Sequence, residues 1–274
     1  MVGAAAPPLV EELHPAPDPW QVARRLAARR HLLFLDSRGL TDGQASYSYL
    51  LAEPYSWLQA RRGQVWLDGR LLPTTDPFAA LQAQLARWQD EALPGLPPFQ
   101  GGAAGLFGYD LCHHIERLPR PRFDDFEVPD LALGFYDVVL AFDHQAGRAW
   151  LISTGFPETD AHKRRQRAEQ RLRQCQHWLR AEAMPPVLHV NGTIEPALRV
   201  PVPQVLPGLC SNFDRASYLD TARRAIEYVH AGDCFQVNIA QRLLLPAQWP
   251  ALELYGRLRE RNPAPFAGYF DLGE

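Results

Sequence analysis

Apolar residues follow two different periods along the chain, which indicates a mixture of helices and strands. In several segments they recur three or four positions apart, as on one face of an α-helix. These predicted helices cover about 18–30, 76–88, 158–183, 218–229 and 250–261. Short apolar or alternating runs between them are typical of strands. The predicted strands cover 31–36, 47–52, 57–60, 64–67, 70–72, 131–143, 148–153 and 235–245, and another begins at Ala267.

Local signals mark where several of these elements begin and end. Aspartate followed by proline, at Asp18 and Asp76, is typical of a helix start, because the carboxylate caps free N–H groups and proline fits the first helical position. Gly232 can take the left-handed conformation that ends a helix. The pairs at 62–63 and 68–69 are typical of tight turns between antiparallel strands. From this pattern alone we expect an α+β fold.

A proline-rich segment with little periodicity interrupts the pattern after the third helix. Its prolines are Pro185, Pro186, Pro196, Pro201, Pro203 and Pro207. Proline removes backbone donors and favours extended chain, so such a segment is typical of a linker. We therefore predict an N-terminal domain at 1–183, a linker at 184–210 and the start of a second domain at 211–274.

Composition narrows the classes of partner. The chain has 274 residues, 46% of them hydrophobic, and its formal net charge of −3 gives no basic footprint for nucleic acid. No stretch approaches the roughly 20 apolar residues of a membrane span, and the N-terminus lacks the pattern of a secretion signal. The four cysteines form no CxxC pair, which argues against a zinc ribbon or a disulfide framework. We expect a cytoplasmic protein.

Three clusters have both a chemical and a structural interpretation. The glycines at 101, 102, 105 and 108 match neither GxGxxG nor a P-loop, so close packing of a strand is favoured over phosphate binding. Cys112-His113-His114 has no companion cluster with metal-ligand spacing, so a loop or helix start is favoured over a metal site. Gln236, Asn238 and Arg242 alternate along the last long strand-like run, so they share a face that either is exposed or meets a ligand.

Three longer segments together resemble a known family. Residues 99–110 (FQGGAAGLFGYD), 232–242 (GDCFQVNIAQR) and 261–266 (RNPAPF) are similar to the chorismate-utilising enzymes. Component I of aminodeoxychorismate synthase is the most similar member, and component I of anthranilate synthase is the next. The order and spacing also match at Ala52-Glu-Pro54 and over 124–129, so the resemblance covers nearly the whole chain.

The resemblance implies a fold and a reaction. The family fold is an α+β sandwich of two lobes, of which this chain would supply the N-terminal lobe, with antiparallel sheets and flanking helices, and the opening of the chorismate-binding region. Chorismate and ammonia, which a separate glutamine amidotransferase subunit supplies, would give 4-amino-4-deoxychorismate for p-aminobenzoate and folate synthesis. The family's Mg²⁺ ligands, acid and nucleophilic lysine correspond to positions beyond Glu274. The resemblance therefore assigns no catalytic residue and no metal ligand here, and we expect this chain alone to be inactive.

What the resemblance does assign is an amino-acid pocket, which in related enzymes binds tryptophan. The corresponding residues are Ser37, Gln44, Ala45, Ser46, Tyr47, Pro265, Phe266 and Ala267. A serine hydroxyl and strand backbone groups can bind the ammonium and carboxylate, while the aromatic rings can pack on an indole. The alternative is that Tyr47 and Phe266 belong to the core.

Two departures from the family bear on which enzyme this is. Asp36-Ser37 stands where feedback-regulated anthranilate synthases have Glu-Ser, and Ser46 replaces an arginine common in the family. These departures favour aminodeoxychorismate synthase. Two alternatives stay open: anthranilate synthase component I, which serves tryptophan biosynthesis, or a module without catalysis that binds tryptophan or docks a partner.

Overall fold

A computed structural model describes residues 7–37, 47–120, 124–182, 200–202 and 205–273. They belong to two compact units. The first comprises Met1–Pro119, Val128–His189 and Pro250–Glu274, and the second comprises Arg120–Glu127 and Val190–Trp249. The last segment of the chain therefore clusters with the first unit. The predicted linker at 184–210 lies largely outside the described residues, so the domain limits at 183 and 211 stay a prediction.

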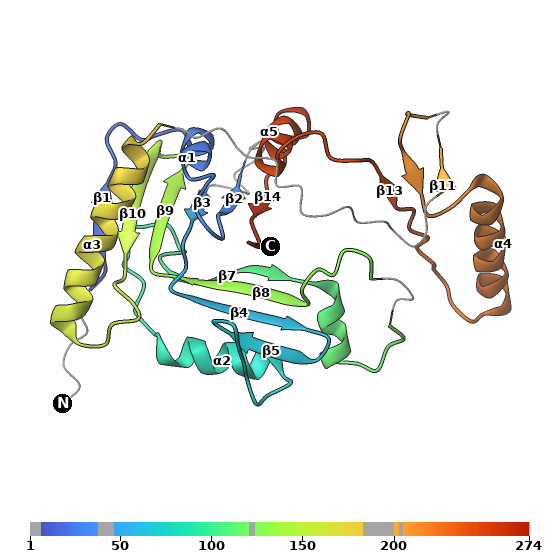
Figure 1. Ribbon diagram of the computed structural model, residues 1–274, viewed down its shortest axis with the longest axis horizontal. Coiled ribbons are helices and arrows are strands. Elements are labelled where there is room, and N and C mark those ends of the chain that lie inside the picture. The colour runs from blue at the N-terminus through green and yellow to red at the C-terminus, as the bar shows by residue number, and fades with distance from the viewer. Residues whose placement is uncertain (1–6, 38–46, 121–123, 183–199, 203–204, 274) are drawn as a thin grey trace. The chain divides into compact units, whose positions relative to one another are not determined.

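Two antiparallel sheets organise the first unit (Figure 1). The six-stranded sheet has the order β1 (Leu9–Glu12), β10 (Arg148–Ser153), β9 (Val138–Asp143), β3 (Tyr47–Leu51), β2 (Leu33–Asp36) and β14 (Ala267–Phe270). The five-stranded sheet has the order β6 (Arg70–Leu71), β5 (Gln64–Leu67), β4 (Ser56–Arg61), β8 (Leu131–Tyr136) and β7 (Gly102–Phe107). With its flanking helices, this architecture confirms the predicted α+β class.

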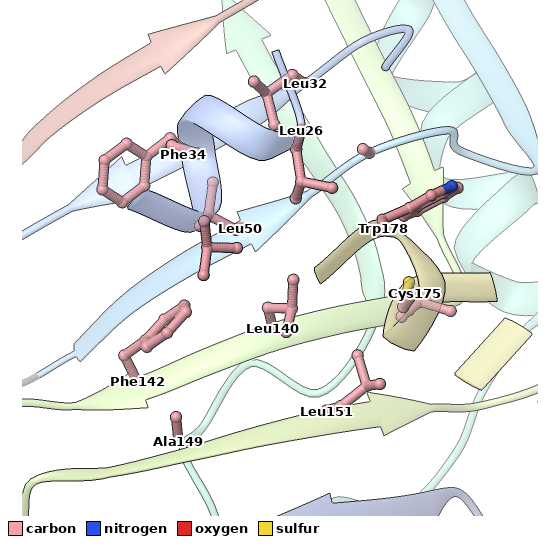
Figure 2. Close-up of a cluster of buried hydrophobic side chains, with 14 of the residues drawn as sticks. Leu26, Leu32, Phe34, Leu50, Leu140, Phe142, Ala149, Leu151, Cys175 and Trp178 are labelled. Atoms are coloured by element: carbon pink, nitrogen blue, oxygen red, sulfur yellow. The ribbon is translucent and has the colours of Figure 1, made fainter. Parts of the chain in front are cut away.

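Helices cover one face of the six-stranded sheet. They are α1 (Pro19–Arg25), α3 (Ala161–Arg180) and α5 (Ala251–Arg261). Their apolar side chains join those of the strands in one buried cluster, in which Leu26, Leu140 and Trp178 are at most 4% exposed (Figure 2). The opposite face of the sheet contributes to a second cluster, which includes Ala104 of β7. A third cluster lies between the five-stranded sheet and α2 (Pro77–Arg87).

The structure differs from the prediction at the long apolar run 131–143. It is two strands rather than one, because the chain passes at Asp137 from β8 in the five-stranded sheet to β9 in the six-stranded sheet. Residues 52–55 make the other passage, from β3 to β4. We call these two places the sheet corners.

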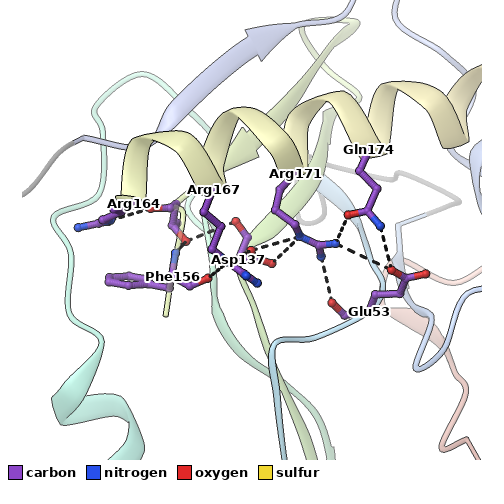
Figure 3. A network of polar contacts seen from close by, with 8 residues as sticks. Glu53, Asp137, Phe156, Arg164, Arg167, Arg171 and Gln174 are labelled. Atoms are coloured by element: carbon purple, nitrogen blue, oxygen red, sulfur yellow. Dashed lines mark hydrogen bonds and ion pairs between the residues drawn. The ribbon is translucent and has the colours of Figure 1, made fainter. Parts of the chain in front are cut away.

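One buried arginine of α3 binds both sheet corners (Figure 3). Arg171 donates from Nε to the carboxylate of Asp137 at 3.2 Å and from Nη2 to the carbonyl oxygen of Glu53 at 3.0 Å. Asp137 is fully buried and also accepts from Nε of Arg167 at 3.2 Å. Because a buried carboxylate needs charged or hydrogen-bonding partners, these contacts hold α3 at the junction of the two sheets.

Close packing of backbone explains the glycine cluster. Gly105 in β7 has a φ of +153°, and a Cβ there would lie 2.2 Å from the carbonyl oxygen of Ala132. A Cβ on Gly108 would lie 2.9 Å from the carbonyl oxygen of Asp130. The predicted close packing is therefore confirmed at Gly105 and Gly108, whereas a Cβ on Gly102 would meet nothing within 4 Å.

The second unit contains α4 (Arg215–Ala231) and three short strands, β11 (Val200–Pro201), β12 (Cys210–Ser211) and β13 (Leu243–Leu244). Asp214 and Ser217 cap α4 reciprocally, and Gly232 ends it at a φ of +83°, as predicted. The predicted strand at 235–245 is wrong except at β13. No residue of α4 is buried. Its apolar residues, such as Ile226 at 55% exposure, meet no buried core within the described part of the second unit.

Arg171→Ala should lower the free energy of unfolding by about 3 kcal/mol or more, because it leaves a buried carboxylate and a carbonyl with fewer partners. Urea denaturation followed by tryptophan fluorescence measures this loss. Arg165→Ala is the matched control on the same helix, since its ion pair with Glu169 is exposed and should contribute less than about 1 kcal/mol. Equal losses in the two variants would contradict the role of Arg171.

Candidate functional site

The six-stranded sheet brings together the two segments of the predicted amino-acid pocket. β14 pairs with β2, so that Ala267 lies opposite Asp36, and β2 pairs with β3. Just beyond β2, Ser37 donates from Oγ to the carbonyl oxygen of Tyr47 at 2.6 Å. Segments more than 200 residues apart in the sequence thus meet at one end of three neighbouring strands.

Five of the eight predicted pocket residues are described: Ser37, Tyr47, Pro265, Phe266 and Ala267. Gln44, Ala45 and Ser46 lie outside the described residues. Phe266 is 74% exposed, so it is not a core residue. Tyr47 is half-buried against the second cluster, with its ring centroid 6.3 Å from that of Tyr49.

Side chains alternate between the two faces of these strands. Leu33 of β2 and Phe270 of β14 point into the second cluster, so Leu35 and Gly268, two residues along each strand, share their face. Leu35 is 39% exposed, and a Cβ on Gly268, its partner in the register, would come no closer to it than 3.9 Å. The edge of the sheet therefore presents open apolar surface beside Leu35.

On the opposite face, the carboxylate of Asp36 is buried beneath α5. Arg259 donates to it from Nε at 2.7 Å and from Nη2 at 3.2 Å, and the Tyr255 hydroxyl donates at 3.1 Å. Burial and the neighbouring Asp36 carboxylate raise the pKa of the Tyr255 hydroxyl. The ion pair joins residues 223 positions apart and holds α5, and with it the start of β14, against β2.

A second set of polar contacts orders the backbone at Ser37. The Ser37 N–H donates to Oγ of Ser48 at 3.0 Å, and this oxygen lies 2.7 Å from Nε2 of His144. Ser48 is fully buried in β3, and His144 lies in the turn between β9 and β10. Burial holds the pKa of His144 below its ordinary value of 6.5. The imidazole is therefore neutral near pH 7.

Sequence reasoning missed Ser48, His144, Tyr255 and Arg259 as parts of this region. Ser48 carried a detectable signal, because it is a polar residue inside the apolar run YSYLL. His144 carried none, since a histidine in a hairpin turn is most simply a surface residue. Only the packing of β2, β3, α5 and the turn between β9 and β10 brings these side chains together.

The other sequence candidates do not assemble a site. Within the described chain, no three or more His, Cys, Asp or Glu side chains are placed to hold a metal ion. Cys112-His113-His114 lies in a 3₁₀ helix, Tyr109–His114. Gln236 and Asn238 are exposed and not in a strand, whereas Arg242 donates to Asp125 at 2.7 Å. The described side chains thus do not fit the Mg²⁺ that the family resemblance implies, and we assign it no ligand here.

Comparison with known proteins identifies the family. The sequence model of a family described as "chorismate binding enzyme" matches residues 36–274. The chain is 32% identical to anthranilate synthase component 1 of Thermus thermophilus over 91% of its length, and 33% identical to aminodeoxychorismate synthase component 1 of Salmonella typhimurium over 85%. It covers 50% and 47% of those two proteins.

A solved structure agrees with this comparison at the level of the fold. Anthranilate synthase component I from Streptococcus pneumoniae aligns with a TM-score of 0.58 and 21% sequence identity, over 82% of this chain and 47% of that one. The chain therefore belongs to the chorismate-binding enzyme family, and it spans about half the length of the relatives it matches. None of the helices described here is both long and apolar enough to cross a membrane.

Asp36→Asn should lower the free energy of unfolding by about 3 kcal/mol, because it leaves the Arg259 guanidinium buried without its carboxylate. Hydrogen exchange should show faster opening of the β2 and β14 amides in this variant. Glu253→Gln is the control on α5, because its pair with Arg257 is exposed and should change stability by less than about 1 kcal/mol. Unchanged exchange at β14 would show that the ion pair does not hold this strand.

Proposed function

We propose that this chain is part of component I of aminodeoxychorismate synthase. In this function, chorismate and ammonia give 4-amino-4-deoxychorismate for p-aminobenzoate and folate synthesis, and a glutamine amidotransferase subunit supplies the ammonia. The observation that carries the proposal is the family match over residues 36–274. Relatives named for this enzyme and for anthranilate synthase are almost equally similar, so the match alone supports both functions.

The environment of Asp36 favours the aminodeoxychorismate function. The Glu-Ser pair of feedback-regulated anthranilate synthases corresponds to Asp36-Ser37, and here both carboxylate oxygens of Asp36 accept hydrogen bonds from Arg259 or Tyr255. A carboxylate engaged in this way on the helix-covered face is a weaker acceptor for an ammonium group beside Ser37, which favours a site without the feedback inhibition of anthranilate synthases. Anthranilate synthase component I is the alternative, and it predicts a different product.

We further propose that the ends of β2, β3 and β14 form an amino-acid site that accepts tryptophan. The proposed contacts are Ser37, Gln44, Ala45, Ser46, Tyr47, Pro265, Phe266 and Ala267. Phe266 supports the proposal, because an aromatic ring with 74% exposure just before β14, which pairs with β2, offers an apolar surface to an indole. β14 is also an edge strand among the described residues, so its outer backbone groups can bind a carboxylate or an ammonium group. The same site would also be expected in the alternative function, a module that binds tryptophan without catalysis.

The chain alone should not aminate chorismate. With ammonium in place of the amidotransferase and Mg²⁺ in excess, we expect no loss of chorismate above the uncatalysed rate, because the described residues hold no metal cluster and the family's catalytic groups correspond to positions after 274. Chromatography of the products measures this. Formation of 4-amino-4-deoxychorismate by the chain would contradict the expectation of inactivity, and formation of anthranilate would support the alternative enzyme.

Tryptophan should stabilise the chain against heat. Ligand at about ten times its Kd contributes roughly 1.4 kcal/mol, which corresponds to a rise in Tm of about 3 °C for a protein of this size. Phe266→Ala should abolish the rise, because the indole loses its aromatic surface. Phe235→Ala is the matched control, since Phe235 is 94% exposed and belongs to the second unit. No rise at millimolar tryptophan, or an equal rise in the Phe266 variant, would contradict the site.

A further inference from the structure

We propose that Ser48 and His144 are positioning residues that hold Ser37 in place for an amino-acid ligand, and that protonation of His144 weakens binding of that ligand. The inference rests on the amino-acid site proposed above. Its basis is a continuous chain of hydrogen bonds from the Ser37 N–H to Oγ of Ser48 and on to Nε2 of His144. We call these three residues the serine–histidine clamp.

The hydrogen bonds of the clamp fix Ser37, the described serine of the proposed pocket. Ser37 is bound twice, through its N–H to Ser48 and through its own Oγ to the carbonyl oxygen of Tyr47 at 2.6 Å. Ser37 thus depends on β3 for its position. β3 in turn is tied by Ser48 to the turn between β9 and β10. A change at His144 therefore reaches the ligand site without touching the ligand.

Protonation of His144 decides which hydrogen bonds Ser48 can make. The Ser48 oxygen accepts from the Ser37 N–H, and its own hydroxyl proton can be donated to Nε2 only when that nitrogen carries no proton. If His144 is protonated, Nε2 becomes a donor toward the same oxygen, and the Ser48 hydroxyl must find another acceptor. Because Ser48 is fully buried, this conflict is costly and shifts Ser48 and Ser37.

Charged groups surround His144 on several elements. Burial has the largest effect and opposes protonation, as does Arg259 of α5. Asp36 at the end of β2, Asp143 at the end of β9 and Asp18 at the start of α1 favour protonation. The net result is a pKa below the ordinary value of 6.5. Affinity should therefore be constant above this value and should fall as the pH drops through the lowered pKa of His144.

The test is the affinity for tryptophan between about pH 5 and pH 8, a range in which the ligand keeps both of its charges. In the unaltered chain we expect binding to weaken toward the acid end of this range, by up to about tenfold, which corresponds to the loss of one buried hydrogen bond. His144→Gln should bind within about threefold of the unaltered chain at neutral pH and show no pH dependence, because its amide oxygen accepts from Ser48 at every pH. His162→Gln, at an exposed position of α3, is the matched control and should keep the original profile.

A measurement without ligand separates this inference from the function on which it rests. In an NMR titration, the Ser37 amide shift should change with the same midpoint as the His144 imidazole, and Ser48→Ala should abolish this coupling. A Ser37 amide that does not follow His144, or a His144→Gln variant that keeps the pH dependence of binding, would overturn the clamp. Absence of tryptophan binding at every pH, with the coupled titration intact, would instead overturn the proposed amino-acid site.

Discussion

The buried guanidinium of Arg171 is the contact on which the arrangement of the two sheets depends. The chain crosses between the sheets at two corners, and this side chain binds the carboxylate of Asp137 at one corner and the carbonyl oxygen of Glu53 at the other. Polar groups at such corners lie away from water and cannot join a strand ladder. Helix α3 supplies the donors that these polar groups need, and its apolar side chains pack on the six-stranded sheet.

The same arrangement gives a structural role to a motif that the sequence alone could only match to the family. Glu53, in the Ala52-Glu-Pro54 segment, has a φ of +51° and offers its carbonyl to Arg171, while its carboxylate accepts from Gln174 at 3.3 Å. The segment is a corner between sheets rather than part of a ligand site. The residues of the proposed amino-acid site lie at the other end of β3.

At that end, β2 separates two kinds of chemistry by the alternation of its side chains. Asp36 points to the face covered by α5 and is neutralised there by Arg259, whereas Leu35 points to the opposite face and is 39% exposed. The ion pair of Asp36 with Arg259 and the serine–histidine clamp both bind the end of β2 at residues 36–37, from α5 and from β3 respectively. Both contribute order to the strand end at which we propose the amino-acid site.

Most individual elements followed from the sequence, because helix caps, tight turns and hydrophobic periods act over a few residues. Asp18, Asp76 and Gly232 marked helix limits correctly. The family resemblance also followed from the sequence, since long motifs in register keep their identity without a structure. The pairing of the Phe266 segment with the Ser37 segment was expected only through that resemblance.

Tertiary structure decided what depends on contacts between distant residues. A run of apolar residues does not show where it leaves one sheet for another, so the break at Asp137 became visible only with its arginine partners. The second unit shows the converse, since among the described residues the alternating pattern at 235–245 pairs with another strand only at Leu243–Leu244. The sequence by itself determined the family, the class of fold and most helix limits, because these depend on local pattern. The sheet order, the burial of Asp36 and the contact of Ser48 with His144 depended on the folded chain, because the free energy of a buried polar group is set by partners that lie far away in the sequence.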